Sequence, residues 1–179
     1  RGIRETLAGR TALIPLRPLT WAEREGRPLW NPVQEILKCR TAAQVAARFS
    51  GPCPATRLEE QIPLGGFPEA ALLLSADRRQ EWHDQYIRTY IERDVPTFVR
   101  PDDVSSFFRF VRLAAGTTAG ILNLAHLARD LQISSDTARR WLNVLESTFV
   151  METLEPYWRN VRKRLTKSPK LHAVDSGLA

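Results

Sequence analysis

Two apolar helical patterns separated by a short polar break occupy residues 122–145, and this stretch limits the possible folds more than any other. In the first pattern, apolar residues recur at three- and four-residue intervals, which predicts one buried stripe on a helix. That stripe consists of Leu124, Ala125, Leu127, Ala128 and Leu131. Ser134 can cap a second helix, whose inner face consists of Ala138, Trp141, Leu142 and Leu145. Together the two patterns have the spacing of a helix-turn-helix.

The outward face of the second helix is polar. It is predicted to carry Ser135, Asp136, Arg139, Arg140 and Asn143. In DNA-binding helix-turn-helix proteins, the corresponding face of the second helix contacts base edges in the major groove. We therefore expect double-stranded DNA as a partner, bound by Ser135, Arg139, Arg140 and Asn143. Contact with another protein is the alternative use of the same surface.

Two strand patterns follow the second helix. Residues 149–154 alternate large apolar and polar side chains, and residues 171–174 can pair with them in an antiparallel sheet. A helix-turn-helix followed by two strands and a connecting loop is typical of a winged helix. The loop between the strands would be the wing.

The predicted wing is strongly basic. Between residues 157 and 170 there is no acidic side chain, and the local charge of +6 equals the formal net charge of the whole chain. Its basic residues are Arg159, Arg162, Lys163, Arg164, Lys167 and Lys170. Phosphates are the most common partner of such a cluster, because their neutralisation releases counterions. We therefore add these six residues to the predicted DNA-binding set; a solvated loop or a docking surface between domains is the alternative.

The remaining sequence predicts mostly helices, so the expected fold class is mainly α. Thr20 and Glu23 match a capping box. Residues 77–95 are expected to form a long helix with Trp82, Tyr86 and Tyr90 in the core. The other predicted helices cover residues 30–39, 41–50 and 103–116. A break near residue 101 divides the chain into two predicted domains, 1–100 and 101–179.

Composition and the positions of cysteine and histidine argue against a membrane protein, a secreted protein and a metal site. No apolar run approaches the length of a membrane span, and no signal peptide is evident, so we expect a soluble protein in the cytoplasm. Cys39 and Cys53 have no neighbouring ligand residues, which argues against a disulfide framework or a zinc site. The histidines His83, His126 and His172 lie in three separate elements and are expected to be solvent-facing or hydrogen-bonded. Asp175 is expected to be a turn residue.

Both ends of the chain suggest a piece of a larger protein. The first residues predict a short helix, followed by an apolar strand over residues 11–16 that has no predicted partner. Such a strand is expected in a truncated parallel sheet. The last residues follow directly on a strand pattern, where a domain would normally continue.

Several sequence blocks occur in an order that resembles a known family. They are LAGR (7–10), PLTWAE (18–23), GGFPE (65–69), YIERDV (90–95), LEPYWRN (154–160), KRLTKSPK (163–170) and DSGL (175–178). In this order, with a helix-turn-helix between the fourth and fifth blocks, they resemble the prokaryotic AAA-type ATP-binding proteins that end in a domain of unknown function. The resemblance covers nearly the whole chain.

This resemblance implies a fold and a nucleotide. Residues 1–100 would be the end of an ATPase core and its helical lid, and residues 101–179 a winged helix with the start of a further domain. The family's P-loop is absent, so ATP and Mg²⁺ are expected only in a full-length parent, and no hydrolysis by this chain alone. The residues implied in nucleotide binding are Gly66, Pro68, Arg88 and Arg93. The implied partners are an upstream ATPase core and a downstream nuclease-like domain of the same protein. A second copy of the chain is a further candidate partner, apart from the resemblance.

Two functions therefore compete. In the first, the chain is part of a nucleotide-driven switch that reorients a DNA-binding winged helix. In the second, it is a stand-alone winged-helix regulator whose N-terminal helices dimerise. We favour the first, because the unpartnered strand over residues 11–16 has no use in a stand-alone regulator.

Overall fold

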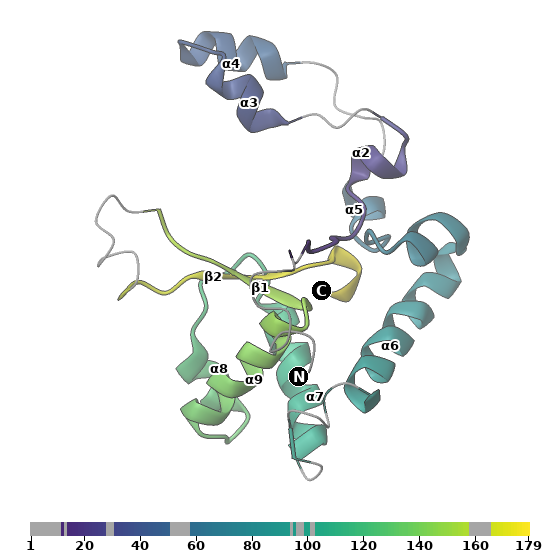
Figure 1. The fold of residues 1–179 in the computed structure, drawn as a ribbon, viewed down its shortest axis with the longest axis vertical. Helices are drawn as coiled ribbons and strands as arrows, with labels where there is room; N and C mark the ends of the chain where they lie inside the picture. The colour runs from purple at the N-terminus through teal and green to yellow at the C-terminus, as the bar shows by residue number, and fades with distance from the viewer. Residues whose placement is uncertain are drawn as a thin grey trace.

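The computed structural model describes residues 12, 14–27, 31–50, 58–93, 95, 99–100, 103–157 and 166–179. This part of the chain is mainly helical, with one small two-stranded antiparallel sheet (Figure 1). The mainly α class predicted from the sequence is thus confirmed. No helix in the described ranges is long and apolar enough to span a bilayer.

The predicted N-terminal strand is not observed among the described residues. Residues 14–20 have no regular secondary structure, and Ile14 and Leu16 are exposed. Pro15 and Pro18 provide a physical reason, because proline has no N–H to donate to a strand ladder. We refer to residues 14–19 as the N-terminal segment; the short helix predicted before it lies outside the described residues.

The described part of the N-terminal half contains four short helices. Their bounds are α2 (Trp21–Arg24), α3 (Pro32–Leu37), α4 (Ala42–Phe49) and α5 (Leu58–Gln61). The capping box predicted for α2 is present, since Thr20 Oγ1 accepts from the Glu23 N–H and the Glu23 carboxylate accepts from the Thr20 N–H. The pair α3 and α4 lies apart from the other helices (Figure 1) and buries no residue.

A long helix follows the GGFPE block. Pro68 leads into a five-residue π-helix, η1 (Glu69–Leu73), and then into α6 (Ala76–Arg93). Of the aromatic residues predicted to be core on α6, Tyr90 is buried, whereas Trp82 and Tyr86 are half-buried. Their rings form a cluster with Phe67, so this stripe covers the GGFPE turn as well as the core.

Three helices enclose the main core. They are α7 (Val104–Gly116), α8 (Leu124–Asp130) and α9 (Ser135–Ser147). Phe107 and Phe110 of α7 contact Trp141 of α9 edge-on, with ring centroids 5.5 and 5.6 Å apart. The predicted inner face of α9 is entirely buried. On α8, however, Leu124 is half-buried and Ala125 is exposed, so the predicted stripe is narrower than expected.

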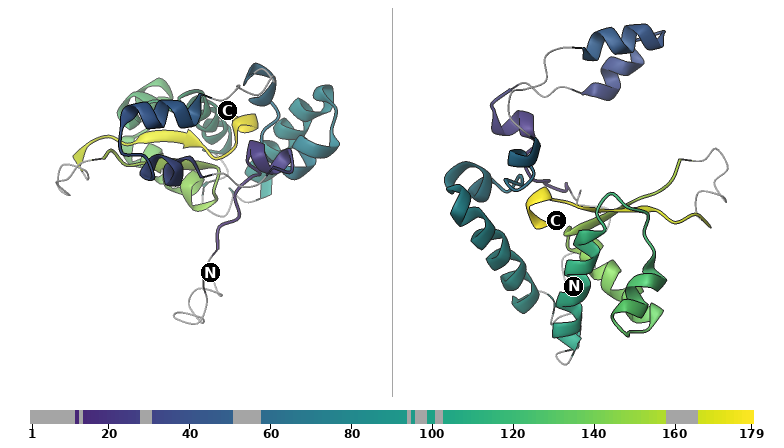
Figure 2. Two further views of the ribbon diagram at one scale, coloured as in Figure 1. Left: turned by 90° about the horizontal axis from the view of Figure 1, so that it is seen from above. Right: turned by 180° about the vertical axis from the view of Figure 1, so that it is seen from behind.

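The sheet closes this core. Strand β1 (Met151–Leu154) pairs antiparallel with β2 (Lys170–Ala173), with Met151 opposite Ala173 and Leu154 opposite Lys170. Leu171 is fully buried beneath the sheet. An isolated bridge joins Ile121 to Lys170. In the two views of Figure 2, the β1–β2 hairpin reaches out beyond the helices.

The predicted strand began two residues too early. Val150 N–H donates to the Leu145 carbonyl and Phe149 N–H to the Glu146 carbonyl, at 2.9 and 3.2 Å. These bonds end α9 in a Schellman motif, with Phe149 in a left-handed conformation at φ 60°. Phe149 therefore belongs to the motif that ends α9, and β1 begins only at Met151.

Candidate nucleic-acid interface

The outward face of α9 is arranged as the sequence predicts. Ser134 caps the helix by accepting a 3.0 Å bond from the Thr137 N–H. All five residues predicted on this face are exposed: Ser135, Asp136, Arg139, Arg140 and Asn143. Arg140 donates to Thr137 Oγ1 at 3.2 Å, while Arg139 has no hydrogen bond or ion pair with any described residue. Both guanidinium groups thus lie at the surface, where N–H groups remain able to donate hydrogen bonds to a ligand.

Part of the predicted basic loop belongs to the described structure. Lys167 and Lys170 are exposed at the loop end of the β1–β2 hairpin. The other predicted phosphate contacts, Arg159, Arg162, Lys163 and Arg164, lie outside the described residues. Antiparallel pairing of β1 with β2 requires the segment between them to leave and return at the same end of the sheet. The two strands that flank the basic loop belong to the same core as α9.

The residues implied in nucleotide binding do not come together in one site. Gly66 is buried, and a Cβ there would lie 2.3 Å from the Leu19 carbonyl oxygen, so its space is already filled by the N-terminal segment. Pro68 lines a cavity beside that segment, whereas Arg88 lines a second cavity between α6 and α7. Arg93 is exposed at the C-terminal end of α6. Nucleotide binding by these residues stays a prediction.

A buried polar cluster was missed by the sequence analysis. Asp175 is 3% exposed, and its carboxylate accepts bonds from the N–H groups of Gly66 and Gly177 at 2.6 and 2.8 Å. His83 of α6 is 2% exposed, and its ring nitrogens have no hydrogen-bond partner among the described residues. Burial lowers the pKa of the His83 imidazole, and the nearby charge of Asp175 opposes that shift.

These findings change two expectations. His83 is neither solvent-facing nor hydrogen-bonded within the described structure. Asp175 does stabilise a turn, through Gly177, but it also joins that turn to the GGFPE block. Only the adjacency of aspartate, serine and glycine could have pointed to the turn, and no local signal marks the long-range bond. The described residues hold no group of three potential metal ligands.

Comparison with known proteins corrects the resemblance to AAA-type ATP-binding proteins. The family model that matches is a domain of unknown function, DUF8612, over residues 55–179. No AAA-type model matches, so the order of short blocks was not sufficient evidence for that family. The matched region also runs across the domain boundary predicted near residue 101.

Two curated relatives are likewise without a known function. They are the uncharacterized proteins Rv2008c of Mycobacterium tuberculosis and Mb2031c of Mycobacterium bovis, each 32% identical over 114 residues. The match covers 64% of this chain and 26% of each relative, so the chain spans about a quarter of their length. No solved structure matches. The family model covers well over half of the chain, and the protein therefore belongs to the DUF8612 family.

Proposed function

We propose that the region from α7 to β2 is a winged helix-turn-helix that binds double-stranded DNA. In this proposal α9 enters the major groove and the basic loop between β1 and β2 contacts phosphates. The order of α7, α8, α9, β1 and β2 supports it, as does the bridge at Ile121, which adds a third chain segment to the sheet. The activities of the longer relatives play no part in it.

The observation that carries the proposal is the division of α9 into two faces. Its apolar face is buried against α7 and α8, whereas Arg139, Arg140 and Asn143 are all exposed. An arginine can donate two bonds to the major-groove edge of a guanine, and an asparagine can bind an adenine in the same way. The exposed face of α9 thus offers groups that can distinguish bases.

Charge supports the second half of the proposal. The chain has 26 basic and 20 acidic residues. Six of the basic residues lie between positions 157 and 170, a stretch that contains no acidic residue. Contacts to phosphates give affinity without sequence preference. Base contacts from α9 would then select the site, while the loop would add affinity for any duplex.

The test is DNA binding by the whole chain, measured by fluorescence anisotropy on duplexes selected from a random pool. Replacing Arg139 and Arg140 by Ala should relax the base preference, at a cost of about 1–3 kcal/mol of discrimination for each lost arginine contact. A matched control replaces two exposed arginines of α6, Arg78 and Arg88, by Ala. This control removes the same charge far from α9 in sequence.

Two results would contradict the proposal. One is that the Arg139 and Arg140 double variant keeps the same base preference as the Arg78 and Arg88 control. The other is the absence of duplex binding above background, which would assign the α9 face to contact with a protein. The exposed apolar residues Ile121 and Leu154, at the edges of the sheet, would then be the first to examine as part of that protein contact.

A further inference from the structure

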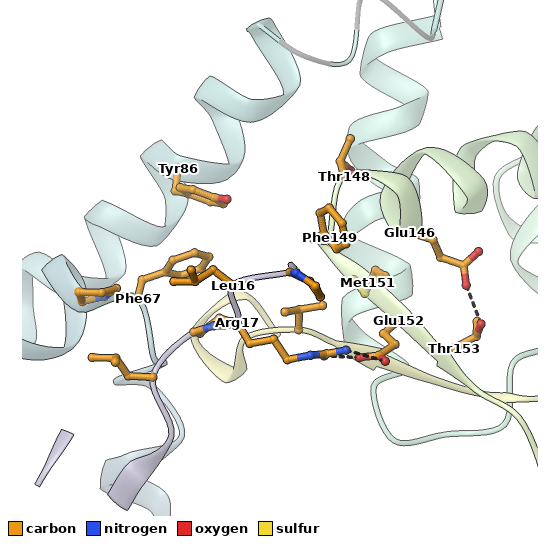
Figure 3. A pocket seen from close by; sticks show the side chains of 15 residues that line it. Leu16, Arg17, Phe67, Tyr86, Glu146, Thr148, Phe149, Met151, Glu152 and Thr153 are labelled. Atoms are coloured by element: carbon orange, nitrogen blue, oxygen red, sulfur yellow. Dashed lines mark hydrogen bonds and ion pairs between the residues drawn. The ribbon is translucent and has the colours of Figure 1, made fainter. Parts of the chain in front are cut away.

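A cavity of about 500 Å³ lies between the N-terminal segment, α6 and the end of α9. Figure 3 shows Phe67 and Tyr86 on one side of it and Phe149 and Met151 on the other, with Leu16 between. The two sides come from chain segments far apart in the sequence. Cavities of this size hold small molecules of drug-like dimensions.

One wall of the cavity consists of aromatic rings that already stack on one another. The centroids of Phe67 and Tyr86 are 4.7 Å apart, with the ring planes tilted by 40°. Trp82 stacks on Tyr86, with ring centroids 5.4 Å apart and ring planes at 17°. These contacts limit the movement of Tyr86, so the wall is prepared to receive a further ring at low entropic cost.

The opposite wall carries an aromatic residue where helix ends favour glycine. Phe149 has φ 60° in the Schellman motif that ends α9, a conformation that is unfavourable for a bulky side chain. Its side chain is also 56% exposed, so burial in the core does not explain its presence. A strained and exposed aromatic residue at the edge of a cavity indicates a binding role.

Three charged residues are among those that line the cavity, and two of them form an ion pair with each other. Arg17 of the N-terminal segment donates two bonds to Glu152 of β1, at 2.5 and 2.9 Å. Glu146 accepts a bond of 2.6 Å from Thr153 Oγ1, and Figure 3 shows its carboxylate pointing away from Phe67 and Tyr86. Glu146 has no cationic partner among the described residues, but its carboxylate lies on the opposite side of the cavity from the aromatic wall.

We infer that this cavity binds a small, flat, uncharged aromatic molecule, held between the Phe67–Tyr86 wall and Phe149. The aromatic walls provide stacking, and the size of the cavity admits a fused-ring compound. The ion pair between Arg17 and Glu152 leaves neither of these two charges for an ionic ligand. The inference does not depend on DNA binding. It concerns a different surface, since none of the outward residues of α9 lines the cavity.

Met151 makes the inference directly testable, because it is the only methionine in the chain and lines the cavity. Protein labelled with ¹³C at the methionine methyl gives one signal, whose shift reports an aromatic ring nearby. The probe is 2-naphthol, and its saturated counterpart decahydro-2-naphthol serves as the comparison. We expect a saturable shift with 2-naphthol and binding of the saturated alcohol weaker by about tenfold, the upper end of the range for ring stacking.

The variants test the proposed stacking partner. Phe149→Leu keeps an apolar side chain and Phe149→Ala removes it, and each should weaken 2-naphthol binding severalfold. Tyr157→Ala is the matched control, since Tyr157 is an 89% exposed aromatic residue that does not line the cavity. It should bind 2-naphthol like the unaltered protein. Circular dichroism verifies that each variant is folded.

Three outcomes would overturn the inference. The first is no shift of the Met151 signal up to the solubility limit of 2-naphthol. The second is equal affinity for the aromatic and the saturated alcohol, which would make the cavity a non-specific apolar space. The third is a folded Phe149 variant that binds as tightly as the control.

Discussion

The backbone N–H of Gly66 donates a 2.6 Å hydrogen bond to Oδ2 of Asp175, across 109 residues of chain. The other carboxylate oxygen of Asp175 accepts from the Gly177 N–H. A Cβ at Gly65, which has φ 62°, would lie 2.2 Å from Oδ1 of the same aspartate. One buried carboxylate thus joins two glycine turns, and only glycine fits at their point of contact.

Removing the carboxylate of Asp175 should destabilise the protein. Asp175→Ala leaves the buried N–H of Gly66 without an acceptor, which costs about 1–3 kcal/mol. Equilibrium unfolding in urea measures this loss, and Glu81→Ala on the exposed face of α6 is the control. Equal stability of the two variants would contradict the structural role of Asp175.

The stability of the protein should fall in mildly acidic solution because of His83. In the unfolded chain this imidazole binds a proton near pH 6.5, whereas burial lowers its pKa in the folded protein. Below that pH the unfolded state therefore binds more protons, so the free energy of unfolding is greatest above about 6.5 and decreases as the pH falls toward the folded-state pKa.

Urea unfolding between about pH 7.5 and 5 measures this dependence, above the range in which carboxylates titrate. His83→Gln should flatten the pH dependence, because it removes the buried imidazole. A slope that persists undiminished in His83→Gln would assign the effect to other groups.

The left-handed backbone conformation of Phe149 should lower the stability of the folded protein. Both Phe149→Gly and Phe149→Ala remove the ring, but only glycine adopts φ 60° without steric conflict. We expect Phe149→Gly to be more stable than Phe149→Ala by about 1 kcal/mol, the reverse of their order inside a helix. Thermal or urea unfolding decides this. A more stable alanine variant would mean that the end of α9 rearranges.

The basic loop should determine how DNA binding depends on salt. Replacing Arg162, Lys163 and Arg164 together by Ala should flatten the plot of log K against log salt by about three times the contribution of one phosphate contact. A triple replacement of exposed arginines elsewhere, Arg78, Arg88 and Arg112, provides the control. An unchanged slope in the loop variant would show that these side chains do not contact phosphates.

Features with a local cause could be predicted from the sequence. The pairing of β1 with β2 could be predicted because two strand patterns follow each other along the chain. Spacing within a few residues was enough to predict the helices α8 and α9, the cap at Ser134 and the capping box at Thr20. The outward residues of α9 were predicted for the same reason. Because the apolar residues of α9 recur on one face of the helix, the polar residues between them must lie on the other face and be exposed.

Features that depend on distant contacts could not be predicted. Neither the bond between Gly66 and Asp175 nor the burial of His83 leaves a periodic signal in the sequence. The cavity beside Phe149 likewise requires the N-terminal segment to pack against β1. Phe149 itself was assigned to a strand, because alternation of apolar and polar residues does not reveal a left-handed helix end.

During synthesis on the ribosome, Gly66 emerges long before its acceptor. The turn that contains Gly65 and Gly66 cannot reach its final contacts until Asp175 and Gly177 have left the exit tunnel, by which time α7, α8 and α9 are already outside. Closing so long a loop is entropically costly unless the intervening chain has folded first. Until then the unpaired turn and the exposed aromatic rings beside it present a surface that a chaperone could recognise.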